Sequence, residues 1–207
     1  MSATSQSALL VRRGLALVAV LGLAACPEPP WPDVTPAPVP PEPPPRVAPA
    51  PADDTTAGAH GAVALSPEAV AALAPIFEHN DRIHAALAGD RADGVGEAGV
   101  AIAEAALAAR RLVTDHAALA LLADVETRAR ALGRGGDLEA MRLAYGELSK
   151  PLVALASAAP ELRGGRHVFM CPMARGYQKW LQVEPSLRNP YFGSKMLTCG
   201  EASDWSP

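Results

Sequence analysis

DLEAMRLAYGELSKPLVALASAAP, residues 137–160, is the stretch that decides the fold, because its apolar residues follow the period of one helix face. They recur at alternating spacings of three and four: Leu138, Met141, Tyr145, Leu148, Leu152 and Leu155. This spacing aligns side chains along one face of an α-helix. Gly135-Gly136 and Asp137 supply a break and an N-cap before the stripe, and Pro160 follows its end. The stretch therefore predicts a helix whose apolar stripe must be covered by other helices.

Three further helices are predicted upstream of this stretch. A helix start is indicated at Ser66-Pro67-Glu68, with a capping hydroxyl, a proline at the first helical position and an acid near the amide end. Short breaks at Gly89, Asp115 and Gly133 separate the helices. Their apolar stripes are Leu73, Ile76, Phe77, Ile83 and Leu87; Val95, Ile102, Leu107 and Val113; and Leu119, Leu122, Val125, Ala129 and Leu132. We expect an all-α fold, an antiparallel up-and-down four-helix bundle.

The first 26 residues, MSATSQSALLVRRGLALVAVLGLAAC, have the pattern of an export signal. Their apolar stretch, residues 15–23, is about half as long as the roughly 20 residues that a membrane-spanning helix needs. Residues 23–26, LAAC, resemble the bacterial lipobox, which implies cleavage before Cys26 and a lipid on that cysteine. Pro27 in place of an aspartate implies sorting to the outer membrane, with the chain facing the periplasm. The alternative is a soluble exported protein in which Cys26 is an unpaired thiol.

A proline-rich tether is predicted over residues 27–64. Thirteen of the 21 prolines lie between Pro27 and Pro51, where a polyproline II conformation would span about 75 Å. The remaining residues, 65–207, are enough for one domain with a sizeable core. The formal net charge of −4 and the scattered arginines provide no basic surface, so nucleic acid is excluded as a partner.

The composition changes after Gly164-Gly165. Six of the nine aromatic residues, two of the three cysteines and three of the five methionines lie beyond this point. We expect this segment to be mostly irregular and to lie across the helices. Trp180, Tyr191 and Phe192 are expected to fill the open end of the bundle, with turns at Asn189-Pro190 and Gly193.

The segment RHVFMCPMARGYQKWLQVEPSLRNPYFGSKMLTCGE, residues 166–201, resembles the C-terminal signature of a bacterial domain family of unknown function. The family occurs on periplasmic copper and silver efflux adaptor proteins and on free-standing exported proteins. The matching elements are Cys171-Pro172-Met173, Trp180-Leu181, residues 189–193 (NPYFG) and Met196-Leu197-x-Cys199-Gly200. Arg142 and Leu148-Ser149 also fit the family's last helix. The resemblance covers residues 65–201 and implies a helical domain whose role concerns heavy metals.

Two interpretations of the sulfur residues remain open. In an exported protein Cys171 and Cys199 are first interpreted as a disulfide, which would stabilise the fold by roughly 3 to 4 kcal/mol. Thiolates and thioethers together also select Cu(I) or Ag(I), and Met170, Met173 and Met196 lie close to the two cysteines in the sequence. The interpretations compete, because an oxidised pair offers no thiolates. Packing of the methionines in the core is a third possibility.

An enzymatic function is not expected. The sequence has no serine in a strained glycine elbow, no glycine-rich phosphate loop and no CxxC motif. Two hypotheses follow. In the first, an exported lipoprotein binds or buffers copper or silver in the periplasm and works with a metal-efflux protein. In the second, a disulfide-stapled structural or adaptor domain binds another envelope protein and has no metal role.

Overall fold

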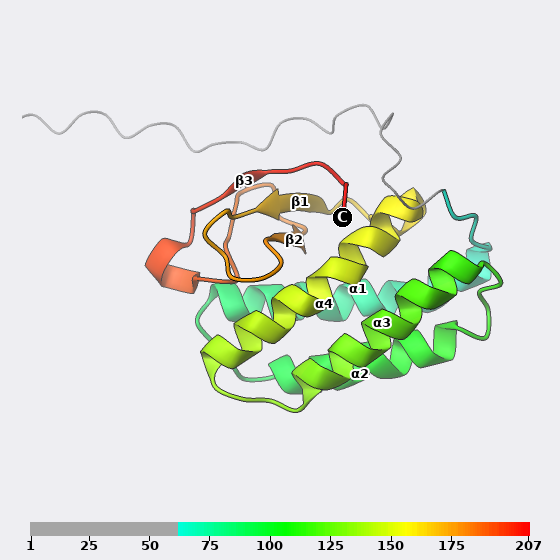
Figure 1. The fold of residues 1–207 in the computed structure, drawn as a ribbon, viewed down its shortest axis with the longest axis horizontal. Coiled ribbons are helices and arrows are strands. Elements are labelled where there is room, and N and C mark those ends of the chain that lie inside the picture. The colour runs from blue at the N-terminus through cyan, green and yellow to red at the C-terminus, as the bar shows by residue number, and fades with distance from the viewer. Residues whose placement is uncertain (1–61) are drawn as a thin grey trace, which may run out of the picture. The chain divides into compact units, whose positions relative to one another are not determined.

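The computed structural model describes residues 62–207. The predicted signal peptide 1–26, the lipidation residue Cys26 and the tether up to residue 61 lie outside the described residues. Within residues 62–207 the chain forms four α-helices, two short 3-10 helices and three short β-strands (Figure 1). No helix in this part of the chain has the length and apolar character needed to cross a membrane.

The four predicted helices are confirmed. They are α1 (Pro67–Ala88), α2 (Val95–Ala109), α3 (His116–Gly133) and α4 (Leu138–Ala158). The side chains of Ser66, Asp115 and Asp137 accept hydrogen bonds from the backbone amides of Ala69, Ala118 and Ala140, at 3.2, 2.8 and 2.8 Å. These caps satisfy amides that the helices leave without partners, so three of the helix starts are set by local chemistry.

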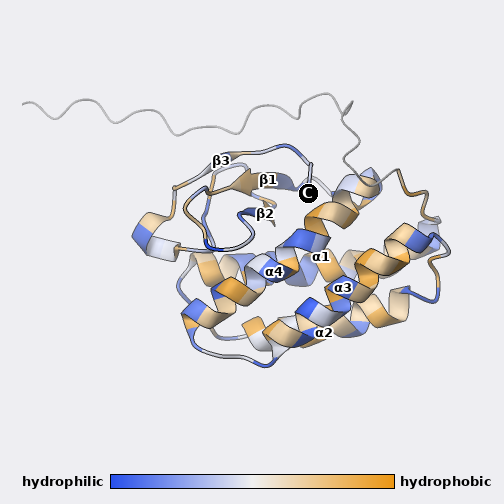
Figure 2. Cartoon of the chain, in the orientation of Figure 1, coloured by the Kyte–Doolittle hydropathy of each residue, from blue (hydrophilic) through white to orange (hydrophobic). Residues whose placement is uncertain are grey.

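Each helix packs mainly against its neighbours in the sequence. Glycine brings α2 and α3 close together, because a Cβ added at Gly99 would lie 3.0 Å from both Ala129 O and Gly133 N. The predicted stripe of α4 is buried except for Leu138, which is partly buried. Figure 2 shows orange and blue residues mixed along each helix, as expected where one face is covered and the other is solvated.

The prediction of a mostly irregular C-terminal segment is wrong. After the 3-10 helix η1 (Pro160–Leu162) come β1 (His167–Met170), β2 (Lys179–Gln182), the 3-10 helix η2 (Gly193–Met196) and β3 (Glu201–Ala202). The strands form one antiparallel sheet in the order β2-β1-β3. Phe169 pairs with Trp180 in β2 on one side and with Ala202 in β3 on the other.

The sheet lies on α1 and α4, which both contact β2 (Figure 1). Trp180 is fully buried, and its ring meets Tyr191 edge-on with the centroids 5.6 Å apart. Tyr191 in turn contacts Tyr145 of α4, at a centroid distance of 6.1 Å. The predicted burial of Trp180 and Tyr191 is confirmed, whereas Phe192 is only partly buried. These aromatic rings join the sheet to the helices.

Candidate functional site

Cys171 and Cys199 come together at the end of the β1–β3 pair. Cys171 follows the last residue of β1, and Cys199 lies two residues before β3. The antiparallel pairing of Met170 with Glu201 brings the chain around these cysteines together. Their Sγ atoms are 3.4 Å apart, and both residues are free thiols. The structure therefore brings together the two cysteines that the sequence pairs, and we call this pair the dithiol.

Hydrogen bonds fix the backbone on both sides of the dithiol. Cys171 N donates to Gln178 O at 3.1 Å, which extends the hairpin formed by β1 and β2. On the other side, Cys199 N donates to Met196 O at 3.0 Å. The buried Asn189 donates from Nδ2 to Cys199 O at 2.7 Å. The thiols thus lie on two loops whose backbones are held independently of any bond between the sulfurs.

Gly200 is the residue that allows the two loops to approach. Its φ is +138°, and a Cβ at this position would lie 2.5 Å from Met170 O and 3.2 Å from the ring of Trp180. Real Cβ atoms do not approach a backbone oxygen so closely, and side chains other than glycine rarely adopt this φ. The glycine after Cys199 is therefore a packing requirement of the site.

The two thiols differ in their surroundings. Cys171 is fully buried, while Cys199 is partly exposed. The hydrogen bond with Cys171, followed by burial, raises the pKa of the Cys199 thiol above its ordinary value. Cys199 is therefore protonated at neutral pH, and any reaction that needs its thiolate must first remove this proton.

The three methionines do not share one environment. Met173 is 60% exposed in the loop after β1, so core packing does not account for it. Met170 ends β1 and is partly buried. Met196 ends η2 and lines a pocket beside α4. Within residues 62–207 no group of three or more His, Cys, Asp or Glu side chains is placed to hold a metal ion.

A buried polar network supports the loop between β2 and Asn189. Trp180 Nε1 donates to Gln182 Oε1 at 3.0 Å, and the Gln182 amide donates to the carbonyls of Glu184 and Ser186 at 2.6 and 2.8 Å. His84 of α1 is buried, and its Nε2 lies 2.8 Å from Arg188 O. Burial lowers the pKa of His84. The neutral ring then donates from Nε2 to the carbonyl.

Arg142 ties the NPYFG turn to the helices. Its Nε donates to Pro190 O at 3.0 Å, and its Nη2 donates to Leu87 O at 2.8 Å and to Asp90 Oδ1 at 2.6 Å. Asp90 Oδ2 also accepts from Ser194 N at 2.9 Å. The hydrogen bonds from Ser194 and Arg142 hold the pKa of the Asp90 carboxyl well below its usual range.

Sequence reasoning missed three residues of this support: Asp90, Gln182 and His84. Gln182 lies two residues after Trp180 in β2, so both side chains are on the same face of the strand. A polar residue on the face of a buried tryptophan was the signal that could have indicated a buried hydrogen-bond network. Asp90 and His84 each contact residues 104 positions away in the chain. No local pattern marks such partners.

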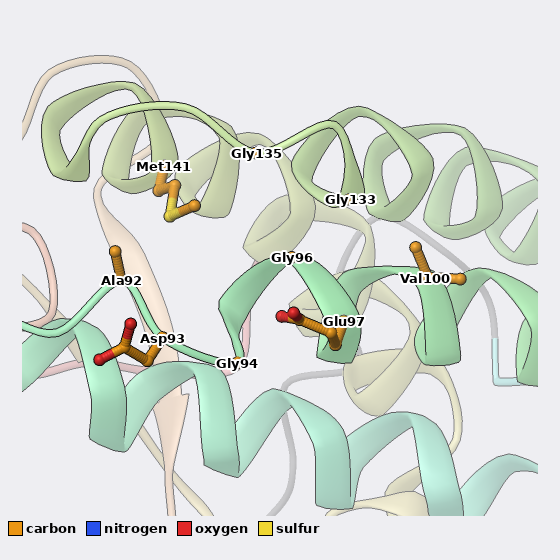
Figure 3. A pocket seen from close by; sticks show the side chains of 9 residues that line it. All are labelled: Ala92, Asp93, Gly94, Gly96, Glu97, Val100, Gly133, Gly135 and Met141. Carbon is orange, nitrogen blue, oxygen red and sulfur yellow. The ribbon is translucent and has the colours of Figure 1, made fainter. Parts of the chain in front are cut away.

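A separate pocket of about 500 Å³ opens where α2 begins. Figure 3 shows Met141 of α4 on one side, with Asp93 and Glu97 on the other. Gly94, Gly96, Gly133 and Gly135 supply much of the remaining lining. Two carboxylates and one thioether do not form a recognisable metal or catalytic site, so the dithiol remains the candidate functional site.

None of the protein-family models, curated proteins or solved structures that were compared with this chain gives a significant match.

Proposed function

We propose that this chain is an exported lipoprotein that binds a soft monovalent metal ion, Cu(I) or Ag(I), through Cys171 and Cys199. In this proposal the four helices form an up-and-down bundle that carries the site, and a lipid on Cys26 anchors the chain to the outer membrane, facing the periplasm. The contact of the two thiols at 3.4 Å is the observation that carries the proposal. The resemblance of residues 166–201 to a family found on copper and silver efflux adaptor proteins points the same way.

A two-coordinate ion would require the two sulfurs to move apart by a small distance. Two metal–sulfur bonds of about 2.3 Å, the length found for zinc, span at most about 4.6 Å in a linear arrangement. The thiols would therefore separate from 3.4 Å by about 1 Å. Cys199 belongs to the more exposed loop and is the residue expected to move.

Binding would release protons. Two thiols and one monovalent ion give a bis-thiolate complex with one net negative charge and two free protons. Because hydrogen bonding and burial raise the pKa of Cys199, metal affinity should increase with pH. Met196 lies three residues before Cys199 and is a candidate additional ligand, but its side chain would have to leave the pocket beside α4 to reach the thiols.

A disulfide-stapled structural or adaptor domain is the second candidate. The same 3.4 Å contact also supports a disulfide between Cys171 and Cys199. To form this bond the sulfurs must approach to about 2.05 Å. That movement is similar in size, and opposite in direction, to the one that metal binding requires. Oxidation would remove two electrons and two protons, which a disulfide of an exchange partner would accept. The stapled domain would then bind another envelope protein.

A Cu(I) titration of the full chain carrying Cys26→Ser tests the first candidate, because this variant retains two of the three cysteines. We expect the reduced protein to take one equivalent of Cu(I) from a chromogenic chelator, and Cys171→Ser or Cys199→Ser to abolish this. Met173→Leu and Met196→Leu measure any thioether contribution, with Met141→Leu as the matched control. A reduced protein that leaves Cu(I) on the chelator would contradict the proposal.

Mass analysis of protein isolated from the cell envelope tests the second candidate and the lipid anchor. Alkylation before and after reduction shows whether Cys171 and Cys199 are oxidised in the cell, as the second candidate requires. The mature N-terminus should be an acylated Cys26. A chain that begins beyond Cys26, or one with a free thiol there, would refute the lipid anchor.

A further inference from the structure

A second pocket lies between α4 and the NPYFG turn, and its features are independent of the dithiol. It has a volume of about 360 Å³, within the range of small-molecule sites. We call it the α4 pocket. Its lining residues come from the start of α4, the loop between β1 and β2, and the chain around η2: Glu139, Arg142, Leu143, Ala174, Arg175, Tyr191, Phe192, Lys195 and Met196.

The charged residues of the α4 pocket leave an excess of positive charge. Three cationic side chains, those of Arg142, Arg175 and Lys195, line it together with one carboxylate, that of Glu139. Glu139 Oε1 already accepts from Arg175 Nη1 at 2.9 Å. Lys195 makes no ion pair within residues 62–207 and is exposed. A ligand with one negative charge would complement this arrangement.

Arg142 contributes a partly buried donor to the pocket wall. Its side chain is only 12% exposed, and its Nε and Nη2 groups are held by Pro190 O, Leu87 O and Asp90. A guanidinium has five N–H donors. Within the described residues 62–207 the two donors on Nη1 have no hydrogen-bond partner. An oxygen acceptor from a ligand would satisfy them without disturbing the contacts that position the arginine.

The remaining lining is apolar. Leu143, Ala174, Tyr191, Phe192 and Met196 supply it. Leu143 is 43% exposed and lies outside the buried stripe of α4. Burial of this surface by a ligand would therefore add a hydrophobic contribution that the fold itself does not use.

We propose that the α4 pocket binds a small amphipathic monocarboxylate. Its carboxylate would lie between Lys195 and Arg142, and its apolar body would cover Leu143 and Phe192. The pocket volume of about 360 Å³ lies at the lower end of the range for small-molecule sites, so the ligand is a small acid. This site goes beyond the metal-binding function and needs no metal.

Calorimetric titration of the full chain with 3-phenylpropionate tests the assignment. The matched neutral probe is 3-phenylpropan-1-ol, which has the same apolar body without the charge. We expect the acid to bind at least about tenfold more tightly than the alcohol, with an affinity that falls as salt is added. No metal is present in this titration, so its outcome is independent of the dithiol.

Two variants separate the electrostatic and apolar contributions. Lys195→Glu should weaken binding of the acid by at least about tenfold and leave binding of the alcohol unchanged. Leu143→Trp should fill the pocket and weaken binding of both probes. Lys150→Glu, an equal charge change at an exposed position of α4 outside the pocket, should leave both affinities unchanged.

Thermal unfolding of each variant verifies that the fold is retained, and both pocket substitutions are at exposed positions. Equal affinity for the acid and the alcohol would overturn the proposal, since it would show an apolar groove without anion recognition. Undiminished binding of the acid by Lys195→Glu would overturn it as well. So would the absence of measurable binding of the acid by the folded full chain.

Discussion

Replacing Gly200 by alanine should both destabilise the fold and separate the two thiols. The positive φ of +138° strains a non-glycine residue by about 1 to 3 kcal/mol. In addition, the new Cβ would lie 2.5 Å from Met170 O, so β3 must move away from β1. Loss of about two backbone hydrogen bonds, of the kind that Ser203 N makes with Val168 O, adds roughly 2 kcal/mol. The total is about 3 to 5 kcal/mol.

Gly136→Ala is the matched control for this prediction. Gly136 has a similar φ of +149°, and a Cβ there would meet only the Cβ of Ala140, at 3.2 Å. It should therefore show the strain contribution of about 1 to 3 kcal/mol without the displacement of a strand. Urea unfolding measures both variants, and the difference of about 2 kcal/mol corresponds to about 4 to 8 °C in Tm.

The second measurement is the reactivity of Cys199 toward iodoacetamide under native conditions. In Gly200→Ala the thiol should react faster, because it loses the hydrogen bond with Cys171 that raises its pKa. Equal destabilisation by Gly200→Ala and Gly136→Ala, with unchanged alkylation of Cys199, would refute the argument that the close approach of β1 and β3 assembles the dithiol.

Three further predictions follow from buried groups. The lowered pKa of His84 means that the unfolded chain takes up a proton near its ordinary pKa of 6.5 while the native ring stays neutral. The free energy of unfolding should therefore fall as pH drops from about 7.5 to about 5.5, and a His84→Gln variant with an equally steep fall would contradict this. Cys171→Ala should lower the pKa of Cys199 and raise its alkylation rate at pH 8 severalfold, whereas an unchanged rate would argue against the thiol–thiol hydrogen bond. Tyr145→Phe removes the 3.2 Å hydrogen bond to the buried Asn80 Oδ1 and should lower the free energy of unfolding by about 1 to 3 kcal/mol in urea titrations; a neutral effect would show that Asn80 finds another donor.

The helices were predictable because their information is local. The stripe of α4, the capping residue Asp137 and the break at Gly135-Gly136 all lie within one stretch of sequence. The caps Ser66 and Asp115 are local in the same way. Periodicity and capping are therefore sufficient to place the four helices, with boundaries close to those observed.

The sheet was not predictable in the same way. β1 and β2 have four residues each, and β3 has two, too few to establish the alternation that marks a strand. His167–Met170 lies between a glycine pair and a proline, which favours a loop. The strands exist because they pair with each other and bury Trp180 against the helices. Such stabilisation is tertiary and leaves little trace in a short window of sequence.

The candidate site was predictable in its members but not in its geometry. The approach of Cys171 to Cys199 was expected from the count of cysteines and from the resemblance, and the structure places their sulfurs in contact. The exposure of Met173 and the anchoring of the NPYFG turn by Asp90 depend on the sheet and on contacts between distant segments. No local pattern contains that information.

The pairing of β3 with β1 also determines the order in which the site is assembled during synthesis. A chain that emerges from its N-terminal end can form α1 to α4 from contacts between neighbouring helices. Cys171 then emerges 28 residues before Cys199 and stays without its partner until Glu201 and Ala202 arrive to close the sheet. For that interval Cys171 is a thiol that the fold has not yet enclosed and that has no partner sulfur beside it. Any factor that reacts with thiols at this stage encounters Cys171 before the folded protein buries it.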